Sequence, residues 1–239
     1  LVRSSKLNSL EISSEGSLMT PAPQTKRILL LGATGTIGQA TAKALVANGY
    51  NTVCIVRLPT GKKTLEQLQA DLPGTALRAA NVAELDSLDA DGFRGEQFDA
   101  IVSCLASRTG TKKDAYKIDY GANRNALTLA QKYGVPQMVL LSAICVQKPK
   151  LAFQEAKLSF EKELMESGLR CSIVRPTAFF KSLSGQVERV RQGKAYMTFG
   201  DGTLTACKPI SDADLAEYLA ACLEDEALQN KILPIGGPG

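Results

Sequence analysis

The sequence predicts an α/β fold in which a doubly wound parallel sheet has helices on both faces. Two observations carry this prediction. Short apolar segments alternate with longer helix-like segments along the 239 residues, which is the pattern of consecutive β-α-β units. The first of these units also has a glycine-rich turn between its strand and its helix, where a parallel unit needs a tight connection.

The order of the elements follows from this alternation. Apolar runs that suit strands occur at 27–31, 52–56, 76–80, 100–105, 137–142, 171–174 and 232–235. The segments between them that suit helices are 36–48, 65–70, 113–133, 152–167 and 212–223. The first helix ends at Gly49, which turns the chain into the second strand. Because most strands are apolar throughout, we expect the sheet to be buried between two layers of helices.

Composition narrows the class of protein. Hydrophobic residues make up 44% of the chain and the net charge is only +4, so we expect a folded core and no nucleic-acid partner. No apolar run is long enough to span a membrane. The chain has no histidine, so zinc sites and histidine-based catalysis are not expected. Its six cysteines form no C-x-x-C pair; we expect reduced thiols, with Cys54, Cys104, Cys171 and Cys222 in buried elements.

Residues 1–25 differ from the rest of the chain. They are rich in serine and mix basic with acidic side chains. This composition fits a disordered remnant of an organelle transit peptide or a linker. A merely disordered terminus fits it equally well.

Three glycines, Gly32, Gly35 and Gly38, follow the first strand and open the first helix. Gly32 allows a sharp turn, Gly35 allows close approach of a pyrophosphate, and Gly38 allows the helix to pack against the sheet. The helix start also offers free N–H groups to phosphate. The sequence therefore predicts a Rossmann-type dinucleotide site, although a purely structural turn is the alternative. The residues expected to bind the cofactor here are Gly32, Thr34, Gly35, Thr36, Ile37 and Gly38.

Arg57 follows the second strand, at the position that selects between the two nicotinamide dinucleotides. Sites for NAD(H) usually carry Asp or Glu there, whereas arginine can bind a 2′-phosphate through two hydrogen bonds. Lys62 and Lys63 add positive charge. We therefore predict NADPH as the cofactor; a solvated basic loop is the alternative.

Other strand ends are expected to complete the cofactor site, because ligands of open α/β sheets bind there. Asn81 and Val82 follow the third strand. Leu105, Ala106 and Ser107 follow the fourth strand. Ordinary packing at strand ends explains these residues equally well.

The segment from Phe153 to Lys157 bears on the chemistry. Ordinary short-chain dehydrogenases have a Tyr-x-x-x-Lys pair on one helix face, in which tyrosine transfers the proton. Here the lysine is present and phenylalanine replaces the tyrosine. Lys157 can hold the cofactor ribose, which makes it the candidate catalytic residue; a surface pair with Glu161 is the alternative. Hydride addition to an activated C=C bond fits better than carbonyl reduction, with Ser142, Cys145, Tyr120 or water as the candidate proton source.

Several longer blocks carry a family resemblance. They are 102–108, 117–120, 140–149, 153–158, 172–183, 199–202, 207–211 and 233–239. Through these blocks, residues 26–239 resemble the divinyl chlorophyllide a 8-vinyl-reductases, which are atypical, NmrA-like short-chain dehydrogenases/reductases of plastids. The family pattern also has phenylalanine at the position of Phe153.

The resemblance implies a chloroplast oxidoreductase of chlorophyll biosynthesis that uses NADPH to reduce the 8-vinyl group of a divinyl chlorophyllide. It implies that Gly32, Gly35, Gly38, Arg57 and Lys157 hold the cofactor. It also implies that Pro176 and Thr177 lie near the nicotinamide, and that the tetrapyrrole substrate brings the protein to a membrane surface or to pigment proteins. Phe179 and Phe180 are candidate walls for a flat macrocycle, or alternatively plain core aromatics.

Members of that family continue beyond the Gly-Gly-Pro-Gly segment at which this sequence stops. We therefore expect residues 26–239 to comprise the Rossmann domain and a small, incomplete C-terminal substrate lobe. Two other functions stay open at this point. One is a non-catalytic NADP(H)-binding subunit of a larger organelle complex, and the other is an NADP sensor of the NmrA type.

Overall fold

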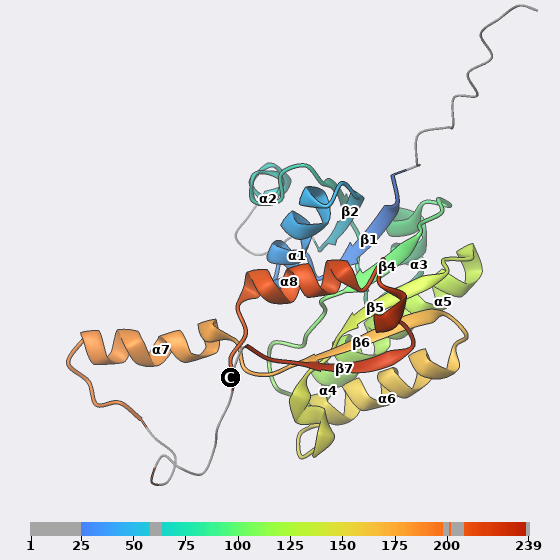
Figure 1. The fold of residues 1–239 in the computed structure, drawn as a ribbon. Helices are drawn as coiled ribbons and strands as arrows, with labels where there is room; N and C mark the ends of the chain where they lie inside the picture. The colour runs from blue at the N-terminus through green and yellow to red at the C-terminus, as the bar shows by residue number, and fades with distance from the viewer. Residues whose placement is uncertain (1–24, 58–63, 198–200, 202–207, 238–239) are drawn as a thin grey trace, which may run out of the picture.

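The computed structural model describes residues 25–57, 64–197, 201 and 208–237. Its centre is a seven-stranded sheet in the order β3-β2-β1-β4-β5-β6-β7, with every pair parallel. The order reverses between β1 and β4, as in a doubly wound Rossmann sheet. Figure 1 shows helices on both faces of this sheet. The predicted fold class is confirmed.

The strands agree with the sequence prediction to within two residues at almost every end. They are β1 (Arg27–Leu31), β2 (Asn51–Val56), β3 (Ala76–Ala79), β4 (Ala100–Ser103), β5 (Gln137–Leu141), β6 (Arg170–Pro176) and β7 (Lys231–Ile235). The segment expected to continue as strand to residue 105 leaves the sheet after Ser103, because the chain there turns toward the cavity described below.

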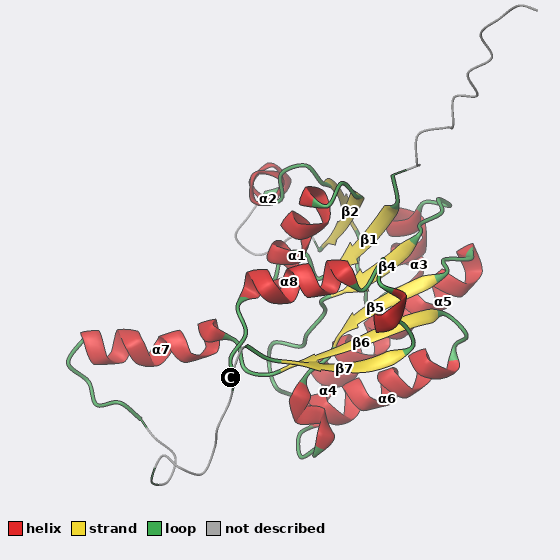
Figure 2. Ribbon diagram, in the orientation of Figure 1, coloured by secondary structure: helices red, strands yellow, loops and turns green. Residues whose placement is uncertain are grey.

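The helices of the described residues cover the sheet in two layers (Figure 2). They are α1 (Thr36–Ala47), α2 (Leu65–Asp71), α3 (Leu85–Ser87), α4 (Lys112–Ala115), α5 (Asn123–Tyr133), α6 (Ala152–Glu166), α7 (Phe180–Arg191) and α8 (Asp212–Ala221). Short π-helical segments occupy Leu88–Phe93 and Tyr116–Ala122, and short 3₁₀ turns occupy Ile144–Gln147 and Glu226–Leu228.

The sheet separates two hydrophobic cores, because successive strand residues face opposite sides. On β1, Ile28 and Leu30 pack in the core shared with α1 and α8, while Leu29 and Leu31 pack in the core shared with α5 and α6. All four side chains are fully buried. This two-sided burial explains why the strands are apolar throughout rather than alternating.

Three helical features differ from the sequence prediction. The helix expected at 113–133 is divided, since Tyr116–Ala122 widens into π-helical turns between α4 and α5. The helical residues at 85–93 and helix α7 were not predicted. Segment 85–93 is only one to two turns long, and α7 contains Ser182, Ser184 and Gly185, which are weak helix formers.

The cysteine prediction is confirmed for the described residues. Cys54, Cys104, Cys171 and Cys222 are buried, and these four and Cys145 are unpaired. Cys207 lies outside the described residues, as do Lys62, Lys63 and residues 1–24. Among the helices that the structure describes, none is long and apolar enough to cross a membrane.

Candidate cofactor and substrate sites

The first candidate site is a cavity of about 370 Å³ at the point where the strand order reverses. Residues that follow the carboxyl ends of β1, β2, β3 and β4 form its walls. Its lining is Gly32, Thr34, Gly35, Ile55, Arg57, Ala80, Val82, Cys104, Leu105, Ala106, Ser107, Arg108, Thr109, Asp114 and Ile118. A cavity of this size at this point of an open parallel sheet is a usual ligand site.

The glycine turn forms one wall of this cavity. Gly32 has φ +77°, and a Cβ atom there would lie 2.6 Å from the carbonyl oxygen of Cys104. A Cβ atom on Gly38 would lie 2.1 Å from the carbonyl oxygen of Gly32. At Gly35, by contrast, the nearest atom to a Cβ would be 3.4 Å away. Gly32 and Gly38 are therefore required by the fold, whereas a Cβ atom at Gly35 would make only an ordinary van der Waals contact.

The start of α1 leaves backbone donors near this turn. The first α-helical hydrogen bond runs from Gln39 N–H to Gly35 O at 2.8 Å. The N–H groups of residues 36–38 therefore have no α-helical acceptor, and they lie at the positive end of the helix dipole. Such a helix start suits a phosphate group.

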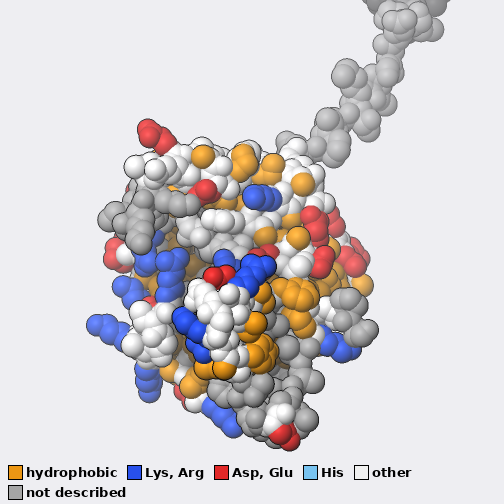
Figure 3. All heavy atoms as spheres, turned by 90° about the vertical axis from the view of Figure 1, so that its left-hand side faces the viewer, with side chains coloured by type: hydrophobic (Ala, Val, Ile, Leu, Met, Phe, Trp, Pro, Cys, Tyr) orange, Lys and Arg blue, Asp and Glu red, His pale blue; other side chains and the backbone are white. Residues whose placement is uncertain are grey.

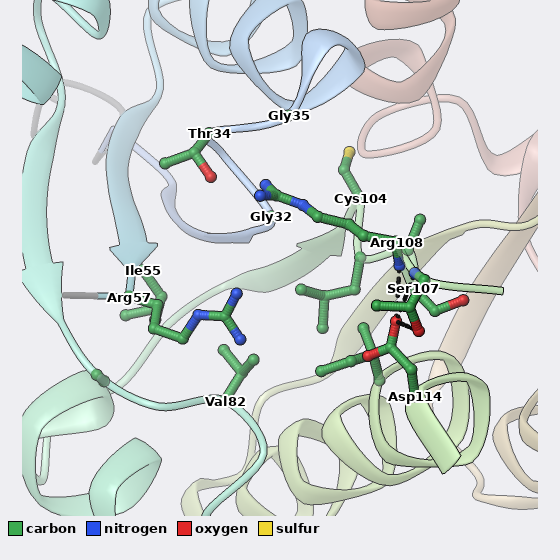
Figure 4. Close-up of a pocket in the computed structure, with 15 residues that line it drawn as sticks. Gly32, Thr34, Gly35, Ile55, Arg57, Val82, Cys104, Ser107, Arg108 and Asp114 are labelled. Carbon is green, nitrogen blue, oxygen red and sulfur yellow. Dashed lines mark hydrogen bonds between the residues drawn. The ribbon is translucent and has the colours of Figure 1, made fainter. Parts of the chain in front are cut away.

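Two arginines reach into the cavity from opposite walls (Figure 4). Arg57 extends from the residue after β2 toward Val82, as the sequence predicts. Arg108 extends from the loop after β4 toward the glycine turn. Arg108 was not predicted as a site residue. The available signal was its position directly after the predicted Ala106 and Ser107.

Asp114 on α4 fixes the loop that carries Arg108. Its Oδ2 accepts hydrogen bonds from Arg108 N (2.8 Å), Thr109 N (2.9 Å) and Thr109 Oγ1 (3.0 Å). These bonds, first of all the one from the Thr109 backbone, lower the pKa of Asp114 below its usual value, and the charge of Arg57 adds to the effect. The carboxylate is therefore engaged by its own loop.

Most predicted cofactor residues lie in this cavity, but not all. Gly32, Thr34, Gly35, Arg57, Val82, Leu105, Ala106 and Ser107 line it. Thr36, Ile37, Gly38 and Asn81 do not. Thr36 accepts a hydrogen bond from Lys181 Nζ at 2.6 Å, and the Asn81 side chain is bound to Glu84 at 2.6 Å.

Lys157 is buried between the ends of β4 and β5, and it lines neither cavity described here. Its Nζ lies 3.2 Å from Asp119 Oδ1, 3.5 Å from Leu105 O and 3.4 Å from Leu141 O. Three acceptors match the three protons of an ammonium group. The π-helical turn of residues 116–122 places Asp119 in this contact, and such turns often occur at functional sites.

The alternative role for Lys157, a surface pair with Glu161, is wrong. Glu161 is 3% exposed and forms an ion pair with Arg175 of β6. It also accepts a hydrogen bond from Ser142 Oγ. Both helix residues therefore point inward, because α6 turns this face toward the sheet.

A second, more open cavity of about 1130 Å³ lies at the carboxyl ends of β5, β6 and β7. Most of its lining is apolar: Ala143, Ile144, Cys145, Phe153, Pro176, Thr177, Ala178, Phe179, Ser182, Lys208, Pro234, Ile235, Gly236 and Gly237. The predicted residues Pro176, Thr177 and Phe179 are among them. Phe180 is not, and its side chain is 57% exposed.

The candidate proton sources are placed differently. Cys145 is exposed and lines the second cavity. Ser142 is buried and donates to Glu161. Tyr120 lines neither cavity, and its hydrogen bond to Glu163 raises its pKa. Of the three side chains, only Cys145 borders the space available to a substrate.

Rossmann proteins use a switch-point cavity with a glycine turn and cationic walls to hold a nucleotide cofactor, and this is the class of protein that the fold and the cavity define. The chain belongs to the NAD(P)H-binding family, whose family model matches residues 32–226. The glycine turn and the two arginines fit a dinucleotide with its phosphates.

Relatives of known name share most of this chain. It is 50% identical over 236 residues to the protein named divinyl chlorophyllide a 8-vinyl-reductase, chloroplastic, from Cucumis sativus, with 95% of this chain and 56% of that protein covered. It is 47% identical over 239 residues to the protein of the same name from Arabidopsis thaliana, covering 96% and 57%. The chain thus spans about half the length of these relatives.

Two more distant matches show how widely the fold is used. The chain is 23% identical to the photosystem II assembly factor Ycf39 from Synechocystis sp., with 88% of this chain and 62% of that protein covered. The solved structure of UDP-glucose 4-epimerase from Thermotoga maritima matches with a TM-score of 0.74 and 18% identity, covering 88% and 76%. The likeness to the epimerase shows the fold alone.

Proposed function

We propose that this chain is the cofactor-binding part of an NADPH-dependent reductase that converts the 8-vinyl group of divinyl chlorophyllide a to an ethyl group. The observation that carries the proposal is the apolar cavity beside the cofactor cavity, with Phe153 in its wall. A large apolar cavity suits a conjugated macrocycle. The names of the cucumber and Arabidopsis relatives support the same substrate.

The chemistry needs little from the protein beyond position. When bound, NADPH supplies a hydride to the vinyl group, and a proton completes the ethyl group. Phe153 cannot transfer that proton, whereas the exposed Cys145 or water in the same cavity can. Phe153 and Phe179 would hold the ring flat against the cofactor, so that most of the rate enhancement comes from orientation.

The choice of NADPH rests on Arg57. Its guanidinium has no hydrogen-bond or ion-pair partner among the described residues, and it points into the cavity beside Val82. An arginine there favours the 2′-phosphate. The other cofactor residues proposed are those of the first cavity, with backbone contacts from Thr36, Ile37, Gly38 and Asn81, and Lys157, Pro176 and Thr177 on the nicotinamide side.

We further propose a chloroplast location, as in the names of the relatives. Residues 26–239 would then form the Rossmann domain with part of a substrate lobe, and residues 1–25 a transit-peptide remnant or linker.

Association with a membrane surface is part of the proposal, and helix α7 supports it. This helix projects from the body of the molecule (Figure 1). Phe180, Val187 and Val190 of α7 are each more than half exposed, and Figure 3 shows basic side chains beside apolar ones on this side. Basic amphipathic helices bind anionic lipid surfaces. Val190→Asp should reduce co-sedimentation with phosphatidylglycerol vesicles, whereas Met165→Asp on α6 should not.

The reductase proposal is tested with the full-length protein, NADPH and divinyl chlorophyllide a. We expect one NADPH to be oxidised for each 8-vinyl group converted to ethyl, measured by absorbance at 340 nm and by chromatography of the pigment. A pigment whose vinyl group stays intact while NADPH binds to the protein would overturn the reductase proposal and leave the cofactor site standing.

A second candidate function is a non-catalytic NADP(H)-binding subunit of an organelle complex. The absence of a tyrosine at position 153 and the match to a photosystem II assembly factor favour it. It predicts a stable partner on native separation of chloroplast extracts. Recovery of the protein as a free monomer that reduces the pigment would decide for the enzyme.

A further inference from the structure

Arg108 shares the first cavity with Arg57, but it occupies a different part of it. Figure 4 shows the Arg57 guanidinium beside Val82 and the Arg108 guanidinium beside the glycine turn of Gly32 and Gly35. The two side chains come from different strand ends, β2 and β4. They are therefore placed to contact two separate groups of one ligand.

Within the part of the chain that the structure describes, no hydrogen bond or ion pair involves the guanidinium group of Arg57 or that of Arg108. The acidic side chain in the cavity wall, Asp114, is already engaged by backbone and hydroxyl donors of residues 108–109. The cavity thus has two cationic side chains and one carboxylate that is already engaged by its own loop, which indicates a ligand with more than one negative group.

The backbone of Arg108 is held in place before any ligand binds. Asp114 accepts its N–H at 2.8 Å, and Thr111 in turn caps α4 through the N–H of Asp114 at 3.3 Å. An anchored backbone reduces the entropy lost when the side chain engages a ligand. The loop is thus built to present this arginine to the glycine turn.

We propose that Arg108 binds the pyrophosphate of the dinucleotide from the side opposite the helix start, while Arg57 binds the 2′-phosphate. The inference rests on the proposed cofactor site and extends it. The glycine turn and the free N–H groups of residues 36–38 define where the pyrophosphate lies. Arg108 is the cation beside that position. Arg57 is the cation that follows β2, where Rossmann proteins bind the adenosine ribose.

The division of labour predicts two different binding phenotypes. Arg108→Ala should weaken NADPH and NADH alike, by about tenfold or more, because both contain the pyrophosphate. Arg57→Ala should weaken NADPH by a similar factor and leave NADH unchanged. The probe 2′-AMP, which lacks a pyrophosphate, should lose affinity only in Arg57→Ala. Dissociation constants from calorimetry or from nicotinamide fluorescence measure these effects without any turnover.

A matched control is Arg191→Ala, which removes an exposed arginine of α7 that lines neither cavity. It should leave all three affinities unchanged. Unchanged NADPH and NADH affinities in Arg108→Ala, with a normal thermal midpoint, would overturn the inference. So would a loss confined to NADPH and 2′-AMP, since Arg108 would then be a second 2′-phosphate ligand. If NADPH binds as expected but the pigment is not reduced, only the reductase proposal fails.

Discussion

The two cavities of this molecule are built in opposite ways. The first is formed by tight backbone turns, two arginines and a loop tied to Asp114, and a Cβ atom has no room at Gly32 or Gly38. The second is larger and mostly apolar, and its walls come from segments near the ends of β5, β6 and β7 that lie far apart in sequence. The first cavity is therefore suited to select a ligand by its charge, and the second to select a ligand by its shape.

This difference between the cavities shows that binding a phosphate-containing cofactor and binding an apolar ligand place different demands on the sequence. A cofactor site for phosphates needs a few backbone positions at fixed spacing, because N–H groups and a helix dipole do most of the binding. A site for an apolar ligand needs a collection of side chains with no fixed spacing. The first kind of site is shared by a wide family, while the second sets the substrate.

The largest expected effect comes from the buried pair that lies between the two cavities. Lys157→Met leaves the Asp119 carboxylate, which is 1% exposed, without its cation. Removing one partner of a buried ion pair typically costs about 3–5 kcal/mol, and Asp119 Oδ2 has no hydrogen-bond partner among the described residues. Chemical denaturation should show a loss of stability of this size.

The double variant Lys157→Met/Asp119→Leu separates structure from function. If Lys157 only neutralises Asp119, the double variant should regain both stability and NADPH affinity. If Lys157 also holds the cofactor ribose, stability should return but affinity should not. A double variant as unstable as the single one would contradict the assignment of the pair as the source of the loss.

The glycines of the first cavity provide the next largest effect. Gly38→Ala places a Cβ 2.1 Å from a backbone carbonyl oxygen, so we expect roughly 3 kcal/mol of destabilisation. In Gly35→Ala the added Cβ atom would make only an ordinary contact at 3.4 Å, so the stability should change by about 1 kcal/mol or less. Its methyl group would instead lie in the cavity wall, and NADPH affinity should fall about tenfold by titration. Equal destabilisation by both changes would count against this division.

The sequence predicted the first cavity much better than the second. Gly32, Gly35 and Arg57 were predicted because they belong to a motif whose residue spacing determines how it binds the cofactor. Arg108 was missed because it lies in an irregular loop whose path depends on Asp114, a contact that no local pattern shows. The Asp119 partner of Lys157 was missed for a similar reason, since the π-helical turn that brings Asp119 to it cannot be inferred from periodicity.

The second cavity was predicted mainly through the family resemblance. Phe179 lies in its wall and Phe180 does not, although the two are adjacent. Their sides are set by the isolated bridge between Phe179 and Ile210, a pairing across more than thirty positions of chain. Helix α7 was missed because it contains Ser182, Ser184 and Gly185, which are weak helix formers.

Phe153→Tyr tests whether the second cavity works by shape. A hydroxyl group in an apolar wall without a partner costs about 1–3 kcal/mol, so we expect pigment reduction to fall several-fold while the NADPH dissociation constant stays constant. Steady-state kinetics with divinyl chlorophyllide, beside cofactor titration, measures both. A faster reaction would instead mean that proton supply limits the enzyme and that this position can provide it. Phe153→Leu, which adds no polar group, is the control.

The smallest effect compares one cysteine from each cavity. Burial raises the pKa of the Cys104 thiol in the first cavity to about 12, so at pH 8 its thiolate fraction is about a thousandfold below that of an ordinary cysteine. Its folded-state pKa lies above the usual value, and the thiol therefore stays neutral until the pH approaches 12. Cys145 in the second cavity is exposed. Iodoacetamide at pH 8 should label Cys145 first, as read by peptide mass spectrometry.

Ligands should then separate the two cavities. Divinyl chlorophyllide should slow the labelling of Cys145, because the pigment would cover the wall that carries this thiol. NADPH, whose adenosine and phosphate groups are proposed to occupy the first cavity, should slow it less. If Cys104 were labelled in the folded protein as fast as Cys145, the first cavity would have to open to solvent far more than its packed turns allow. The contrast between the two cavities would then not hold.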